Sequence, residues 1–251
     1  MTELARFKNR AQAGKLLARQ LAGQFATGSA AGSATPAQGS EALVVALPRG
    51  GVPVAFAVAM TLGLELDVLL VRKLGMPGQP EFAIGAVGSG GVRVLQPGVP
   101  GLMGVTQEQV DALAAHELCE IGRRERLYRG ERPEPAVAGR SVLLVDDGIA
   151  TGSTMLAAVQ VARARQAARV VVAVPVAPPQ TLLALAPHVD ELVCLTAPPR
   201  FRAVSQWYDA FEQTSDEEVQ DLLAMAWRRQ DDCPPHTNPI ERIEHETHPN
   251  R

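Results

Sequence analysis

This 251-residue chain has only three cysteines, and they are widely separated in the sequence. Cys119, Cys194 and Cys233 show neither the spacing of a disulfide framework nor that of a zinc site. No apolar run reaches membrane-spanning length, and basic residues interrupt the amino-terminal segment that a signal peptide would need apolar. We therefore expect a cytoplasmic protein with no zinc site and no contact with a membrane.

An excess of charge of one sign is also lacking. The net charge is −3 and the pI is near 6.0. Arginines at residues 123–129 alternate with glutamates, so we expect no continuous basic surface for a nucleic acid. Only three of the 24 basic residues are lysines, which makes Lys73, beside Arg72, a candidate functional residue.

Short apolar runs alternate with helical patterns along residues 42–195. Strands that are apolar on both faces and separated by helices are typical of a parallel sheet covered on both sides. Thr106 and Gln109 have the spacing of a capping box at the start of a long helix that ends near Gly130. We predict an α/β fold with a mostly parallel, doubly wound sheet. Its strands are expected at residues 42–47, 66–71, 142–145, 170–174 and 191–195.

Residues 142–154, Val-Leu-Leu-Val-Asp-Asp-Gly-Ile-Ala-Thr-Gly-Ser-Thr, form the most informative segment. A buried strand ends in two adjacent acids, and a turn of small residues leads into a helix that begins near Ser153. Ligands of open α/β sheets bind beyond the carboxyl ends of strands, where free amides of the next helix attract an anion. Because Asp146 and Asp147 would repel phosphate, they are expected on vicinal hydroxyls or on water around a divalent metal. The segment therefore predicts a sugar-phosphate site.

Other phosphate motifs do not fit these residues. Gly148 and Gly152 are one residue too close for the Walker A spacing, and no lysine follows them. The cluster of Gly88, Gly90 and Gly91 lacks the dinucleotide-binding spacing and is typical of a hairpin turn. An ordinary capped helix would need neither two adjacent acids nor the Thr-Gly-Ser-Thr sequence. We expect Gly148 and Gly152 to let the backbone approach the ligand closely.

This thirteen-residue segment resembles the signature of type I phosphoribosyltransferases, which bind 5-phosphoribosyl-1-pyrophosphate. The resemblance extends more diffusely over residues 42–195 as an order of strands and helices. It implies that Asp146 and Asp147 face the ribose hydroxyls and metal-bound water, with Mg²⁺ as cofactor and no direct metal ligand. It also implies that the next residues hold the 5-phosphate. These are Ala150, Thr151, Gly152, Ser153 and Thr154.

A second informative segment lies at residues 46–55, where the first strand ends in a glycine-bearing turn. Pro53 suits the first turn of the following helix because it lacks an amide hydrogen. The resemblance assigns Arg49, Gly50 and Gly51 to the loop that receives pyrophosphate, where family members often carry a cis peptide bond that does not involve proline. An ordinary turn with a solvated arginine is the alternative that these residues alone leave open.

Arg72 and Lys73 are expected to close the strand at residues 66–71, on the same sheet edge as the two loops. The resemblance places a cationic pair here against the pyrophosphate. Residues 74–91 then resemble the family's mobile catalytic flap, in which glycines and prolines should prevent regular structure apart from a hairpin of residues 83–87 with 92–95. The flap departs from the family because no Lys or Arg lies between Lys73 and Arg93. Glu81, its only charge, orders the flap, meets a substrate amine or is simply solvated.

Four of the ten aromatic residues fall within eleven positions, between the last strand and a helix expected near residues 216–228. Residues 196–214 are the candidate for the variable hood that covers the active site in phosphoribosyltransferases. Tyr208 could stack on a flat heterocycle, while packing against the core is the alternative for most of these rings. Residues 1–230 are interpreted as the phosphoribosyltransferase-like domain, with a flexible linker at 28–40 and a disordered tail at 231–251.

The resemblance implies Mg²⁺-dependent transfer of the 5-phosphoribosyl group between 5-phosphoribosyl-1-pyrophosphate and a small nitrogenous base or amine. Asp146, Asp147, Arg72 and Lys73 would take the catalytic roles in a homodimeric enzyme. Two alternatives stay open: a non-catalytic sensor of the donor or of a nucleotide, and a hydrolase that uses water as the nucleophile. The sequence does not determine the acceptor.

Overall fold

The computed structural model describes residues 6–25, 42–101 and 104–232. The predicted linker at residues 28–40 lies outside these ranges, and so does the side chain of Glu81. The tail was predicted to begin at residue 231, but helix α6 (Asp216–Asp232) continues to Asp232, and the remainder of the tail lies outside the described residues.

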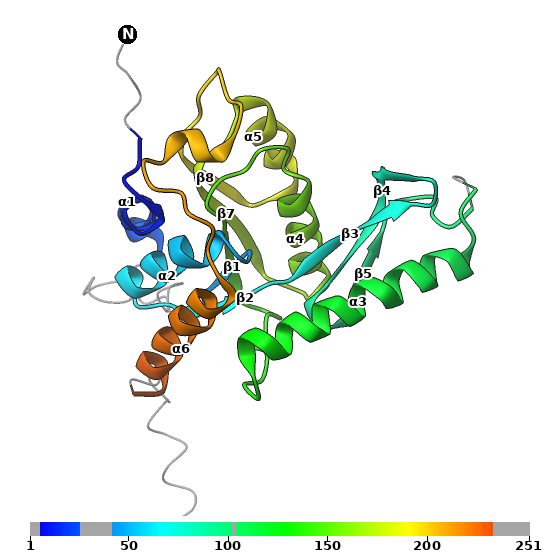
Figure 1. Ribbon diagram of the computed structural model, residues 1–251, viewed down its shortest axis with the longest axis horizontal. Coiled ribbons are helices and arrows are strands. Elements are labelled where there is room, and N and C mark those ends of the chain that lie inside the picture. The colour runs from blue at the N-terminus through cyan, green and yellow to red at the C-terminus, as the bar shows by residue number, and fades with distance from the viewer. Residues whose placement is uncertain (1–5, 26–41, 102–103, 233–251) are drawn as a thin grey trace, which may run out of the picture.

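The centre of the protein is a sheet of five parallel strands in the order β2-β1-β6-β7-β8 (Figure 1). Each predicted strand of this sheet is present, and the predicted parallel arrangement is confirmed. Branched apolar side chains dominate because both faces of the sheet are buried. The strands are β1 (Ala42–Ala46), β2 (Glu65–Val68), β6 (Ser141–Val145), β7 (Arg169–Val176) and β8 (Glu191–Thr196).

Alternate residues along the strands enter two separate hydrophobic clusters. Val44 and Leu143 belong to the cluster that contains α1 (Arg10–Phe25), α2 (Gly51–Leu62) and α6. Their neighbours Val45 and Leu144 pack with α4 (Ser153–Ala164) and α5 (Pro179–Leu185) on the other face (Figure 1). The chain leads from β1 to β2 on one side and from β6 to β7 on the other. The order therefore reverses between β1 and β6, where open sheets bind ligands.

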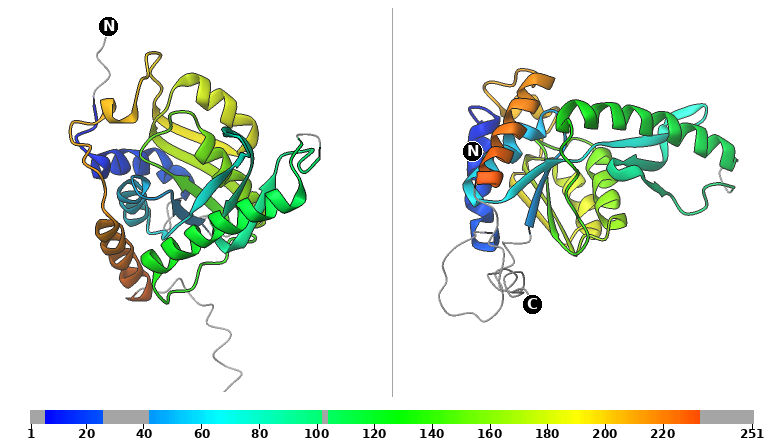
Figure 2. Two further views of the ribbon diagram at one scale, coloured as in Figure 1. Left: turned by 45° about the vertical axis from the view of Figure 1, so that its right-hand side comes forward. Right: turned by 90° about the horizontal axis from the view of Figure 1, so that it is seen from below.

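Between β2 and β6 the chain builds a second unit, residues 71–130, which we call the arm. An antiparallel sheet of β3 (Val71–Met76), β4 (Gln79–Gly88) and β5 (Val92–Leu95) packs against the long helix α3 (Gln107–Arg129). The arm extends away from the parallel sheet (Figure 2). The predicted capping box of α3 is confirmed, and so is the hairpin of β4 with β5.

The expectation that the rest of residues 74–91 lacks regular structure is wrong. The β3–β4 ladder accommodates the glycines of this segment, one of them paired on both sides within β4 and the others at a register shift, at a strand end or in turns. Gly75 stands at a register shift between β3 and β4, and Gly78, with φ of 78°, lies in the turn that joins them. The cluster predicted as a hairpin turn forms the short 3-10 helix η1 (Ser89–Gly91) between β4 and β5.

The strand predicted at residues 66–71 is two strands in different sheets. β2 ends at Val68, and Val71 begins β3. Ser89 holds the chain where it changes sheets, because its hydroxyl accepts a hydrogen bond from the amide of Leu70 at 3.0 Å. Arg72 and Lys73 therefore lie inside β3 and do not close a strand of the parallel sheet.

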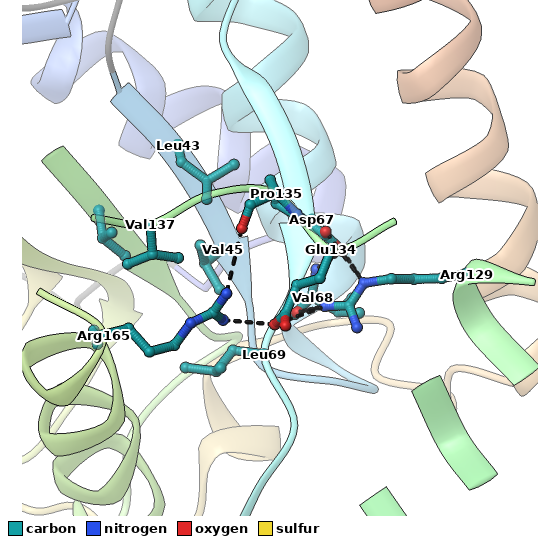
Figure 3. Close-up of a pocket in the computed structure, with 12 residues that line it drawn as sticks. Leu43, Val45, Asp67, Val68, Leu69, Arg129, Glu134, Pro135, Val137 and Arg165 are labelled. Carbon is teal, nitrogen blue, oxygen red and sulfur yellow. Dashed lines mark hydrogen bonds and ion pairs between the residues drawn. The ribbon is translucent and has the colours of Figure 1, made fainter. Parts of the chain in front are cut away.

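A buried charge network ties the end of α3 to the parallel sheet (Figure 3). The Nε of Arg129 donates to Asp67 of β2 at 2.9 Å, and its other nitrogens lie 3.2 Å from Glu125 and 3.6 Å from Glu134. Arg165, which follows α4, contacts Glu134 at 2.5 Å. Burial raises the pKa of Asp67 to about 6, although Arg129 opposes this. The network joins the arm, β2 and α4 at one point.

Two further 3-10 helices complete the described elements. η2 (Ala186–His188) follows α5, and η3 (Val204–Trp207) lies in the segment of residues 196–214. No helix in the described ranges is both long and apolar enough to span a membrane.

Candidate active site

The two glycine-bearing loops touch at the carboxyl ends of β1 and β6. A side-chain carbon on Gly50 would lie 2.2 Å from Oδ2 of Asp147. One on Gly51 would lie 2.8 Å from the carbonyl oxygen of Val145 and 3.1 Å from Oδ1 of Asp146. Glycine is required at residue 51, where the neighbour is main chain, whereas a side chain at residue 50 would displace the carboxylate of Asp147. The structure thus brings together residues from two segments that are separate in the sequence.

Gly51→Ala should lower the free energy of unfolding by about 1–3 kcal/mol, the usual cost of forcing a methyl group into a packed site. The new methyl group would meet a main-chain carbonyl of β6, which cannot rotate away as a side chain can. Urea unfolding measures the loss. Gly23→Ala in α1 is the control because nothing lies within 4 Å of its added carbon, and it should gain up to about 1 kcal/mol from helix propensity. Equal stability of the two variants would contradict the close contact.

The turn after the acidic pair has the features of an anion site. Gly152 has φ of 80°, in the left-handed region that favours glycine, and directly precedes Ser153, the first residue of α4. Ala150, Thr151 and Thr154 are exposed, and the hydroxyls of Thr151 and Ser153 lie 3.3 Å apart. The start of α4 thus combines free helix amides with three hydroxyl side chains, the groups that bind a phosphate.

Thr181 of α5 supports this turn, a role that its sequence context does not predict. Its hydroxyl donates to the carbonyl oxygen of Ala150 at 2.7 Å. Its methyl group lies so close to Gly152 that an added side-chain carbon there would come within 2.8 Å. A lone threonine after two prolines carries no sequence signal for this contact.

The acidic pair is held in a desolvated position. Burial raises the pKa of Asp146 well above its usual range, and the charge of Asp147 adds to the rise. Burial also raises the pKa of Asp147, although Arg10 opposes it. The Oδ1 of Asp146 accepts a hydrogen bond from the amide of Asp147 at 2.8 Å. Two neighbouring carboxylates with little water are stabilised by hydroxyl donors or by a cation, and a ribose with a hydrated metal offers both.

Arg10, at the start of α1, is a site residue that the sequence analysis missed. Its Nε donates to Oδ2 of Asp147 at 2.8 Å, and its Nη1 donates to the carbonyl oxygen of Glu212 at 2.7 Å. Its guanidinium carbon lies 3.9 Å from the centre of the Phe211 ring. Arg10 thus joins three segments that are distant in sequence. Its only sequence signal was a charge near an amphipathic helix, which a surface residue would also give.

The segment of residues 196–214 packs directly against the acidic pair. A side-chain carbon added to Gly148 would lie 2.6 Å from the side chain of Val204 in this segment. Gly148 was expected to let the backbone approach a ligand, but it makes room for Val204 instead. Tyr208 is 4% exposed and packs between two phenylalanine rings. Its hydroxyl donates to the carbonyl oxygen of Asp147 at 2.6 Å. The expected stacking of Tyr208 on a substrate therefore does not fit its burial; it supports the main chain of the second acid.

Arg49 lies beside the site with its charge directed to α6. The peptide bond between Pro48 and Arg49 is cis, a feature that the resemblance associates with this loop. The Nη1 of Arg49 is 3.7 Å from Oδ1 of Asp216, which also accepts a hydrogen bond from the hydroxyl of Tyr128 at 2.6 Å. The half-exposed Arg49 side chain is available for a new partner because water already reaches this ion pair.

A cavity of about 260 Å³ opens between the arm and the two loops. Arg72 and Lys73 of β3 line it, so they reach the predicted place although their strand was assigned wrongly. Arg124 of α3 also lines it and was missed, because the arginines at residues 123–129 were interpreted as alternating surface charge. Further walls come from Leu47, Pro48, Leu69, Leu70, Thr154 and Ala157.

Mg²⁺ is the cofactor that the resemblance implies, and the donor set agrees with it. Asp146 and Asp147 supply carboxylate oxygens, and Mg²⁺ commonly binds through one or two carboxylates, several waters and substrate phosphates. Among the described residues no cluster of three or more His, Cys, Asp or Glu side chains could hold a metal ion. Most ligands would therefore come from the substrate and from water, with the two acids contacting the hydrated ion.

Known proteins match this chain over most of its length. Residues 12–209 match the family model of the phosphoribosyl transferase domain. The Mycobacterium tuberculosis protein Rv0571c, which carries the name of a phosphoribosyl transferase, is 46% identical over 222 residues, which cover 88% of this chain and 47% of that protein. The chain thus spans about half the length of the curated relatives it matches. The crystal structure of TT1426 from Thermus thermophilus is 44% identical with a TM-score of 0.77, covering 88% of this chain and 98% of that chain.

Proposed function

This chain belongs to the phosphoribosyl transferase domain family, and we propose that it transfers the 5-phosphoribosyl group between 5-phosphoribosyl-1-pyrophosphate and a nitrogenous base or amine, with Mg²⁺ as cofactor. One observation carries the proposal: Gly50 and Gly51 touch the acidic pair at the switch point of the sheet. A phosphorylated sugar that also carries pyrophosphate needs anion sites at its two ends and hydrogen-bond acceptors between them. The described site offers all three.

Each part of the donor has a matching part of the site. The turn at residues 150–154 would bind the 5-phosphate through the amides of α4 and nearby hydroxyls. Asp146 and Asp147 would accept hydrogen bonds from the ribose hydroxyls. The amides of residues 50–51, with Arg72 and Lys73, would receive the pyrophosphate. Arg49 would join them by leaving its solvent-exposed contact with Asp216.

The proposed reaction exchanges one bond at C1 of the ribose for another. The bond from C1 to a pyrophosphate oxygen breaks, and its electron pair leaves with the pyrophosphate. The acceptor nitrogen forms the new bond to C1 and releases its proton to water. Positive charge grows on the ring and negative charge on the leaving group, so the acids favour the first and the cations with the loop amides favour the second. Mg²⁺, when bound, supplies further positive charge to the pyrophosphate.

Pyrophosphate release over a panel of purine, pyrimidine and pyridine bases tests this function. We expect release from the donor and Mg²⁺ to depend on the presence of one class of base. Release that is independent of any base would indicate a hydrolase. Donor binding in a calorimeter with no release on any base would indicate a sensor. Either result would overturn the proposed transfer.

The proposal includes a cytoplasmic homodimer that binds no nucleic acid, with residues 196–214 as the hood over the acceptor. Analytical ultracentrifugation of the full chain measures the oligomeric state. A monomer at micromolar concentration would contradict the dimer and leave the proposed chemistry standing, because the residues assigned above all come from one chain.

A further inference from the structure

Helix α3 places one cation on the side that faces the cavity. Arg124 lies three residues after Ile121 and four residues before Tyr128, whose exposed fractions are 2% and 4%. Residues at these spacings share one face of a helix. Arg124 therefore belongs to the inward face of α3, and it lines the cavity together with Arg72 and Lys73.

The neighbouring arginines of α3 have different surroundings. Arg123 has a side chain that is 59% exposed and lies 3.2 Å from Glu120. Arg129 belongs to the buried charge network, and Arg126 is exposed and does not line the cavity. Arg124 differs from these arginines because its position on the helix places it in the lining of the cavity.

Two of the three cations that line the cavity lack a balancing carboxylate. Among the side chains that the structure describes, no Asp or Glu oxygen lies within 4.0 Å of the charged nitrogens of Lys73 or Arg124. Arg72 has Glu117 at 3.7 Å. Converging positive charges repel each other, more strongly where water is partly excluded. The arrangement therefore favours an anion that carries several charges between them.

Beyond Arg72 and Lys73, the strands of the arm bring no further cation to the lining of the cavity. The sequence has no Lys or Arg between Lys73 and Arg93. Arg93 is bound to Asp111 of α3, so its charge is already compensated. Within the arm, positive charge beyond Arg72 and Lys73 therefore comes to the cavity from α3.

We propose that Arg124 binds the pyrophosphate group of the donor and stabilises the negative charge that develops as the C1–O bond breaks. This inference rests on the proposed phosphoribosyl transfer. The electron pair of the broken bond passes to a pyrophosphate oxygen, and a guanidinium can donate two parallel hydrogen bonds to such oxygens. Arg124 transfers no proton, because arginine stays charged throughout. A helix of the arm thus adds a third cation to the two that β3 brings to the cavity.

Arg124→Gln, compared with Arg126→Gln, tests the inference. Both changes remove one charge from the same helix, but residue 126 lies outside the cavity. Arg124→Gln should lower kcat/KM for the donor by about 100-fold or more, the usual effect of losing one group that stabilises developing charge. It should also weaken the binding of Mg²⁺-pyrophosphate, measured by calorimetry without any acceptor, by about 10-fold, the loss expected for one charge-assisted hydrogen bond. Arg126→Gln should stay within about twofold in both measurements, and Arg124→Lys should recover part of the loss because it restores a point charge.

Failure of the inference and failure of the proposed function give different results. If Arg124→Gln matches Arg126→Gln in a wild-type protein that transfers phosphoribosyl groups, the inference is overturned and the function stands. If no base is accepted but Arg124→Gln alone weakens Mg²⁺-pyrophosphate binding, the assigned contact is supported and the function is overturned. If the wild type binds no pyrophosphate, both fail. Thermal unfolding of each variant shows that the protein remains folded.

Discussion

Replacing both acids of the site, Asp146→Asn with Asp147→Asn, should lower kcat/KM for the donor by about 1,000-fold or more, because the charge that favours a cationic ribose ring is lost. The amide side chains keep the shape of the carboxylates but can no longer accept hydrogen bonds with both oxygens or attract a hydrated Mg²⁺. Calorimetry in the presence of Mg²⁺ should show weaker donor binding. Pyrophosphate release measures the loss of turnover. Donor affinity equal to that of the wild type would refute the role assigned to the pair.

The stability of the same variant separates a site defect from a folding defect. Burial raises the pKa of both carboxyls, so their ionised forms oppose folding near neutral pH. The double variant should therefore unfold at a temperature no lower than that of the wild type. Asp221→Asn with Asp232→Asn is the matched control, because it removes two charges from exposed positions of α6. That control should keep full turnover.

The sequence predicted the parallel sheet well because local and global signals agree there. Each strand of that sheet is buried on both faces, so a continuous run of branched residues such as 142–145 has few other stable placements. The acidic pair and the turn after it follow a strand directly, and the sheet topology fixes where such a turn must lie. The contact of Gly50 with Asp147 could be expected from the shared sheet edge.

The sequence could not predict contacts that depend on packing between distant segments. Arg10 reaches Asp147 across 137 positions, and Tyr208 reaches the same residue from the other end of the chain. The arm was misjudged for a different reason: Gly75 and Gly78 are typical both of a loop and of strands that bend and turn, and only the pairing with β4 decides between them. The sequence did not predict the role of Arg124, because alternating charges occur on both the inward and the outward face of a helix. Only the packing of α3 shows which arginine lies on the inward face.

Arg129→Met should lower the free energy of unfolding by about 3–5 kcal/mol at pH 8, because it leaves a buried carboxylate without its cation. The Arg129 side chain is 5% exposed, and its charge is shared with Asp67 of β2, with Glu125 of α3 and with Glu134, which follows the arm. Urea unfolding measures the change. Arg123→Met on the same helix is the control, and it should cost no more than about 1 kcal/mol because its ion pair with Glu120 is exposed to water.

The pH dependence of this loss identifies Asp67 as its source. The pKa of Asp67 is raised to about 6 in the folded protein, from a usual 3.8, so its favourable contribution below about pH 4 is lost as the pH rises through 6. Without Arg129, which lowers this pKa, the charged form becomes more costly still. The destabilisation by Arg129→Met should therefore be smaller at pH 5 than at pH 8, by about 1 kcal/mol or more. Adding Asp67→Asn should recover most of the stability at pH 8 and remove the difference between the two pH values. A loss that is the same at both pH values, or that Asp67→Asn does not relieve, would place the effect in packing and not in the buried charge.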